Sequence, residues 1–92
     1  MKREQVTNFY SGHVQGVGFR YRVKSLASGY DVTGLVRNLM DGRVELVCEG
    51  TRTELEEFLQ AVRDSEIGRF IRREQTVWGE AKNTFRGFDI TN

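Results

Sequence analysis

A nine-residue stretch near the N-terminus, Gly12–Arg20, combines the residue types that bind anions. Gly16 and Gly18 reach backbone angles that other residues adopt only at a cost, so successive N–H groups there can converge on one point. A helix N-terminus adds unpaired N–H donors, and the planar guanidinium of Arg20 matches two phosphate oxygens. The pattern predicts a cradle for a small phosphorylated ligand, although the same glycines also suit a plain strand-to-helix connection.

A second segment, Gly34–Glu45 followed by Gly50, places an asparagine beside a predicted hairpin. Asp41 and Gly42 lie between two runs of alternating apolar residues, which is the pattern of a tight turn. Asn38 then falls at the end of the first strand, just before the turn. Taken alone, such an asparagine is most often a turn residue that hydrogen-bonds its own backbone.

The two segments resemble the two signature sequences of the acylphosphatases, a family of small enzymes that hydrolyse carboxyl-phosphate anhydrides. Every position of Gly12–Arg20 fits the first signature, and Gly34–Glu45 fits the second except at two positions. Leu35 stands where the family usually has an aromatic residue, and Met40 stands where many members have proline. Neither position supplies the chemistry that the resemblance implies.

The resemblance implies hydrolysis of small acyl phosphates to a carboxylate and inorganic phosphate, without a metal or an organic cofactor. It implies that Arg20 and Asn38 are catalytic, with Arg20 holding the phosphoryl group and Asn38 orienting the attacking water. It also implies that the loop backbone binds the phosphate. The expected phosphate-binding residues are Gln15, Gly16, Val17, Gly18, Phe19 and Arg20.

Two alternatives remain beside a free-standing acylphosphatase. One is a non-catalytic module of the same fold that binds phosphate or another anion, or regulates. The other arises because acylphosphatase-like domains also begin larger carbamoyl-transfer proteins. Since this chain ends after the domain and lacks the cysteine-rich segments expected beyond it, we expect the free-standing enzyme.

Length and composition predict a single domain over residues 1–92, large enough to fold without disulfides. The only cysteine, Cys48, has no partner within the chain, and the N-terminus shows no apolar leader, so we expect a cytoplasmic protein. Fourteen basic and thirteen acidic residues leave a net charge of +1, which argues against nucleic acid or a membrane as partner. We expect a monomer that binds acyl phosphate and, as product and inhibitor, inorganic phosphate.

Periodicity and capping signals predict the elements that must position these residues. Strands are expected over residues 5–11, 31–39, 43–49 and 70–77, with a short fifth strand around 88–90. Helices are expected over residues 18–28 and 51–65. Gly29 is expected to cap the first helix, and Thr51 with Glu54 is expected to form a capping box for the second.

This order is βαββαβ with a small added strand, which predicts an α+β, ferredoxin-like sandwich: an antiparallel sheet with two helices on one face. Acylphosphatases have this fold, but so do proteins with other functions. An RNA-recognition module would carry stacking aromatic residues on its middle strands, and residues 43–49 contain none. A metal carrier would need paired cysteines, whereas Cys48 is alone and is expected in the core.

The remaining chemistry-bearing residues are expected to have structural roles. His13 is not needed as a base for a good leaving group, and we expect it only to flank the loop. The basic residues within 69–73 are expected to protect an edge strand from aggregation. Core or rim packing is expected for three aromatic residues: Tyr21, Tyr30 and Trp78.

Overall fold

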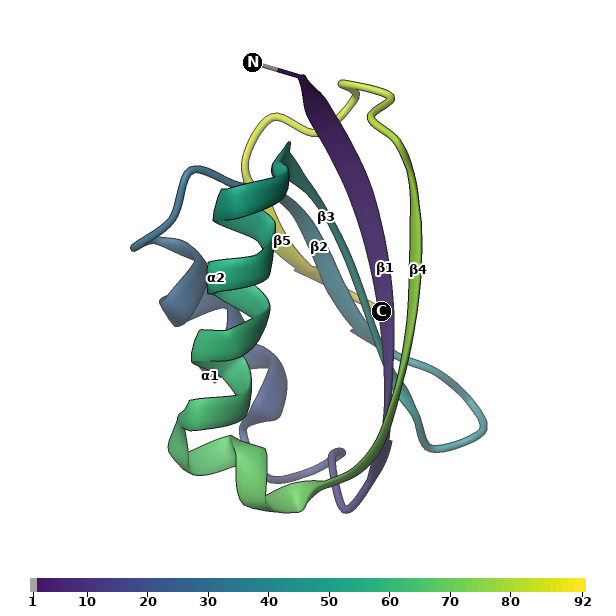
Figure 1. Cartoon of the computed structure of the whole chain (residues 1–92). Coiled ribbons are helices and arrows are strands. Elements are labelled where there is room, and N and C mark those ends of the chain that lie inside the picture. The colour runs from purple at the N-terminus through teal and green to yellow at the C-terminus, as the bar shows by residue number, and fades with distance from the viewer. Residues whose placement is uncertain (1) are drawn as a thin grey trace.

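The computed structural model describes residues 2–92 and arranges them as one layer of strands and one layer of helices (Figure 1). The strands are β1 (Arg3–Gly12), β2 (Thr33–Asn38), β3 (Val44–Thr51), β4 (Ile71–Glu80) and β5 (Phe88–Thr91). The helices are α1 (Phe19–Ala27), α2 (Arg52–Asp64) and the short 3-10 helix η1 (Glu66–Phe70). The predicted α+β, ferredoxin-like βαββαβ sandwich with a short C-terminal strand is confirmed.

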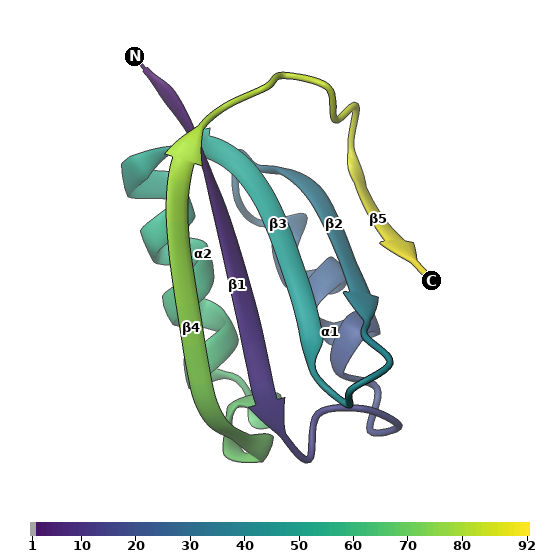
Figure 2. The ribbon, with the colours of Figure 1, turned by 90° about the vertical axis from the view of Figure 1, so that its right-hand side faces the viewer.

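The strands lie in the order β4-β1-β3-β2-β5, so β4 and β5 are the edge strands of the sheet (Figure 2). β1 pairs antiparallel with β3 and β4, and β2 pairs antiparallel with β3. β5 pairs parallel with β2, with Phe88 opposite Gly34 and Thr91 opposite Arg37. The sheet is therefore antiparallel through its four main strands and mixed only at the β5 edge.

The core lies between the sheet and the helices, which cover the same face (Figure 1). On β3, Val44, Leu46 and Cys48 are all fully buried, as their alternation predicted. Burial raises the pKa of the Cys48 thiol to about 12, so this cysteine is an inert core residue. The helices contribute Phe19, Val23, Ala27, Leu55, Phe58, Leu59 and Val62.

The helix ends differ in detail from the prediction. The hydroxyl of Thr51 accepts the backbone N–H of Glu54 at 3.4 Å, so the predicted cap of α2 is confirmed. The Glu54 carboxylate instead accepts the N–H of Asp31 at 2.7 Å, so the capping box was wrong in this half. Ser28, and not Gly29, is the C-terminal cap of α1. The Glu54 carboxylate bonds a residue 23 positions away, whereas Ser28 bonds the Ser25 and Leu26 carbonyls of its own helix.

The fourth strand is longer than predicted and follows an element that the sequence did not indicate. η1 comes directly after α2, and β4 continues to Glu80. β4 is an edge strand on which Arg72 and Arg73 are exposed, in agreement with the protective role expected for them.

The segment between β4 and β5 is fastened to the sheet by one carboxylate. The Glu49 side chain accepts the backbone N–H of Lys82 and of Asn83, each at 2.9 Å, and the amide of Gln5 at 2.7 Å. Burial by itself raises the pKa of the Glu49 carboxyl, but these donors outweigh burial and hold the pKa below its usual range. The ionised carboxylate thus fixes the path that leads into β5.

Glu49→Gln is expected to lower the free energy of unfolding by about 1–3 kcal/mol at neutral pH, because an amide leaves at least one buried N–H without an acceptor. The folded-state pKa of Glu49 is lowered, so its stabilisation is present above the usual pKa and is lost as pH falls below it. Denaturant unfolding from pH 7 to pH 3 measures both effects. The gap between wild type and variant should close in acid, and a constant gap would contradict this role. Glu66→Gln, on an exposed ion pair with Arg22, is the matched control.

Candidate active site

The loop between β1 and α1 has the backbone conformation of an anion cradle. Gly16 and Gly18 both have φ of 79°, in the left-handed region. A Cβ at either position would meet no atom within 4 Å, so backbone angle and not space requires glycine there. Alanine at either position is strained by about 1–2 kcal/mol. Gly16 and Gly18 therefore adopt the backbone angles that the sequence predicted.

The N-terminus of α1 is left open by its own sequence. Its N-cap is Gly18, which offers no side-chain hydrogen bond, and its first turn contains no acidic residue. The first N–H groups of the helix thus lack the side-chain acceptors that usually satisfy them. Together with the positive end of the helix dipole, they suit an anion that lies beyond Gly18.

A hollow of about 170 Å³ lies at this loop and reaches the end of β2. The residues that line it are Val14, Gly16, Gly18, Phe19, Arg20, Tyr21 and Asn38. The structure thus brings the predicted Arg20 and Asn38 to one site. Gln15 and Val17, which were predicted as backbone donors, do not line the hollow.

Arg20 brings positive charge to the hollow from the first turn of α1. Its Nη1 donates to the backbone carbonyl of Thr91 on β5 at 3.4 Å. Within residues 2–92, no carboxylate forms an ion pair with Arg20, in contrast to Arg22 and Arg37, which pair with Glu66 and Glu45. The Arg20 guanidinium therefore keeps its charge available for an anion.

Asn38 brings a side-chain amide to the same hollow. It is the last residue of β2 and lies opposite Val44 on β3. Its Oδ1 atom is buried and has no hydrogen-bond partner within residues 2–92. Buried polar atoms in folded proteins usually have a hydrogen-bond partner, so the free Oδ1 atom is an unusual feature of this residue.

Comparison with known proteins agrees with this geometry. The family model described as acylphosphatase matches residues 6–90. An acylphosphatase of Thermobifida fusca is 37% identical over 89 residues, covering 97% of this chain and 98% of that protein. This chain belongs to the acylphosphatase family. The crystal structure of acylphosphatase from Bacillus subtilis matches with a TM-score of 0.86 at 33% identity, over 97% of this chain and 99% of that one.

Acylphosphatase-like structure also occurs within a longer protein. The crystal structure of full-length HypF in its phosphate- and nucleotide-bound form matches with a TM-score of 0.82 at 25% identity. That match covers 100% of this chain but 12% of HypF. The Thermobifida relative, by contrast, matches over nearly its whole length.

The two departures from the acylphosphatase signatures lie outside the hollow. Leu35 is half-buried on β2, opposite Val47 of β3 and Asp89 of β5. Met40 is fully exposed in the turn between β2 and β3. Neither lines the hollow, so both departures leave its walls unchanged.

Tyr21 lies at the hollow, whereas Tyr30 and His13 lie elsewhere. Tyr21 lines the hollow while 71% exposed, in agreement with the core or rim packing expected for it. Tyr30 packs on Phe58 with ring centroids 5.8 Å apart. His13 is exposed, its ring lies 6.1 Å from that of Phe70, and it does not line the hollow.

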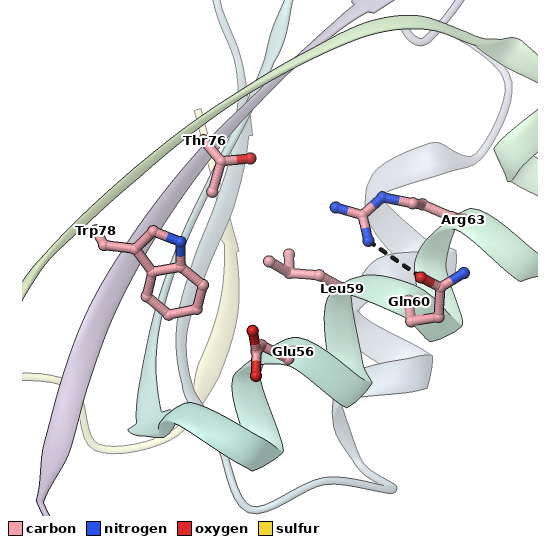
Figure 3. Close-up of a pocket in the computed structure, with 6 residues that line it drawn as sticks. All are labelled: Glu56, Leu59, Gln60, Arg63, Thr76 and Trp78. Atoms are coloured by element: carbon pink, nitrogen blue, oxygen red, sulfur yellow. Dashed lines mark hydrogen bonds between the residues drawn. The ribbon is translucent and has the colours of Figure 1, made fainter.

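A larger hollow, of about 360 Å³, lies between α2 and β4 (Figure 3). Its walls include Trp78 on the strand and Glu56 and Arg63 on the helix. The Arg63 guanidinium is already paired with the Glu74 carboxylate at 2.8 Å, and the Glu56 carboxylate would repel an anion. The smaller hollow is therefore the one suited to phosphate, despite its size.

Proposed function

We propose that this chain hydrolyses the carboxyl-phosphate anhydride bond of small acyl phosphates, by attack of water on a phosphoryl group held in the Gln15–Arg20 loop. The acylphosphatase family and its curated members support this activity. The observation that carries the proposal is the meeting of the Arg20 guanidinium, which pairs with no carboxylate within residues 2–92, and the Asn38 side chain in one hollow.

The phosphoryl group is held by donors that are fixed before the substrate arrives. Its oxygens accept hydrogen bonds from N–H groups of the loop and of the first turn of α1. The guanidinium of Arg20 donates to two of these oxygens. Charge on these oxygens redistributes as the bond to the leaving carboxylate breaks. Donors aimed there in advance stabilise the transition state more than the ground state.

The attacking water is oriented by Asn38. Its side-chain amide forms a hydrogen bond with the water, so that the water oxygen faces phosphorus and bonds to it while the bond from phosphorus to the acyl oxygen breaks. A carboxylate is a good leaving group, so a strong protein base is unnecessary, and the water proton passes to the phosphate itself. His13 has no part in this scheme, and Tyr21 forms an exposed part of the wall of the hollow.

The alternative of a non-catalytic anion-binding module is not favoured. The family model that matches residues 6–90 and the curated relative that matches over nearly its whole length are both acylphosphatases. This argument favours hydrolysis over binding alone.

The surroundings of the enzyme are also part of the proposal. The one cysteine is buried, which agrees with a reducing, cytoplasmic compartment. Within residues 2–92, no helix is long and apolar enough to span a bilayer. The exposed large apolar residues are Tyr21, Met40 and Val77, and we infer a monomer from their scatter over separate elements. Inorganic phosphate, as product, should compete with substrate for the cradle.

The test is hydrolysis of benzoyl phosphate by the whole chain in excess chelator, corrected for spontaneous breakdown. We expect catalysed release of one phosphate per acyl phosphate, with competitive inhibition by inorganic phosphate. Phosphate binding without turnover would overturn the proposal in favour of the binding module. Turnover that requires an added metal ion would contradict the metal-independent scheme.

A further inference from the structure

The side chain of Gln15 joins the cradle loop to the hairpin between β2 and β3. Its Nε2 donates to the backbone carbonyl of Leu39 at 2.8 Å and to that of Arg43 at 2.9 Å. These bonds span 24 and 28 residues of sequence. The expected role of Gln15 was as a backbone donor, but its side chain contacts the other half of the site.

The chemistry at this contact requires an amide. Two carbonyl oxygens face one side-chain atom, so that atom must carry two hydrogens, and this fixes the orientation of the Gln15 amide. A glutamate would direct an acceptor at both carbonyls, and an apolar side chain would leave both without this donor. The contact is therefore specific to glutamine in length and in polarity.

The carbonyls that Gln15 contacts flank the Asn38–Val44 pair at the end of the β2–β3 ladder. Leu39 directly follows Asn38, and Arg43 directly precedes Val44. The Leu39 N–H also donates to the Arg43 carbonyl at 2.8 Å, so the Gln15 amide closes a small network across the mouth of the hairpin.

Within residues 2–92, no other side-chain hydrogen bond joins the cradle loop to the hairpin between β2 and β3. The Oδ1 atom of Asn38 has no hydrogen-bond partner there, so no bond through that atom holds the side chain in place. The turn has its own support, because the Asp41 carboxylate accepts the Arg43 N–H at 3.1 Å. That bond shapes the turn but does not reach the cradle, whereas the Gln15 bonds do.

We propose that the Gln15 side chain is a positioning residue, which sets Asn38 at the correct place relative to the phosphoryl group held in the loop. This inference rests on the proposed function and adds to it the contact that joins the phosphate-binding loop to the strand end that carries Asn38. A water held by Asn38 must meet phosphorus in line, and misplacement by about 1 Å can lower a rate by roughly 100-fold. A substitution of the Gln15 side chain leaves every backbone N–H of the loop in the chain, so the phosphate donors themselves are kept.

Gln15→Met keeps the length of the side chain and removes both donors. We expect kcat for benzoyl phosphate to fall by about 10–100-fold, while the inhibition constant of inorganic phosphate changes by less than about threefold. Gln15→Asn, with its amide one methylene short, should fall between wild type and Gln15→Met. Gln60→Met is the matched control, because Gln60 donates only to Asp64 on the surface of α2. It should leave kcat unchanged.

The double variant Gln15→Met/Asn38→Ala separates positioning from a general structural effect. If Gln15 acts through Asn38, adding Gln15→Met to Asn38→Ala lowers kcat no further. Full additivity, or equal loss of phosphate binding and kcat in Gln15→Met, would overturn the inference.

A readout without turnover keeps the inference separate from the proposed function. In ¹H–¹⁵N spectra with inorganic phosphate bound, the side-chain amide signal of Asn38 should shift or broaden in Gln15→Met and not in Gln60→Met. An unchanged signal would overturn the positioning role even in an active enzyme. A shifted signal in a chain that hydrolyses no acyl phosphate would support the contact while rejecting the proposed function.

Discussion

Replacing Arg20 with alanine is expected to lower kcat/KM for benzoyl phosphate by about 100-fold or more and to weaken phosphate binding at the same time. Arg20 lines the hollow from the first turn of α1, and no carboxylate within residues 2–92 neutralises it. Loss of one preorganised donor to a developing anion typically costs 100- to 1,000-fold in rate. Both constants should change, because the same donor serves the bound phosphate and the transition state.

Two further variants define what Arg20 contributes. Arg20→Lys keeps the charge but loses the planar fork, so it should recover part of the phosphate affinity and little of the turnover. Arg22→Ala removes a neighbouring arginine that pairs with Glu66 at 2.8 Å on the surface, and it should leave both constants near wild type. Wild-type turnover in Arg20→Ala would remove Arg20 from the mechanism.

The parts of the site that the sequence predicted are those fixed by neighbours in the chain. Gly16 and Gly18 adopt the left-handed angles that their spacing indicated, because such angles depend on residue type more than on surroundings. The turn at Asp41 and Gly42 likewise places Asn38 at the end of β2. Each of these features is decided within about ten residues.

The parts that the sequence did not predict depend on contacts between distant segments. The amide of Gln15 finds its carbonyls on another hairpin, and the guanidinium of Arg20 meets Thr91 across 71 residues of sequence. Local periodicity carries no information on which side chain will reach which backbone group. The same reason explains why Glu54 bonds to Asp31 and not to its own helix.

The pairing of the β5 strand is also a contact between distant segments that the sequence did not predict. The alternation of Phe88 and Ile90 indicated a strand, but not its partner or direction. Its parallel place beside β2 follows from the long connection after β4, which Glu49 fastens to the sheet through Lys82 and Asn83. That place carries Thr91 to Arg20, so an element outside both signatures contributes to the site.

Asn38→Ala is expected to lower kcat by about 100-fold or more while the inhibition constant of inorganic phosphate stays within about twofold of wild type. The side-chain amide is assigned to the water and not to the phosphoryl group, so binding and turnover should separate here, in contrast to Arg20→Ala. Steady-state hydrolysis of benzoyl phosphate with phosphate as competitor measures both. Parallel loss of phosphate binding would reject the division of labour between the two residues.

The stability of Asn38→Ala gives a second, independent result. The Oδ1 atom of Asn38 bonds no protein group within residues 2–92, so Asn38→Ala removes no hydrogen bond of the fold through that atom. Removing it should therefore leave the free energy of unfolding equal to that of wild type or higher, even as activity falls. If Asn38 were retained for folding, Asn38→Ala would instead lower the free energy of unfolding. A variant that is inactive, binds phosphate and unfolds at the same or a higher denaturant concentration would identify the Asn38 oxygen as a group kept for catalysis at the expense of stability.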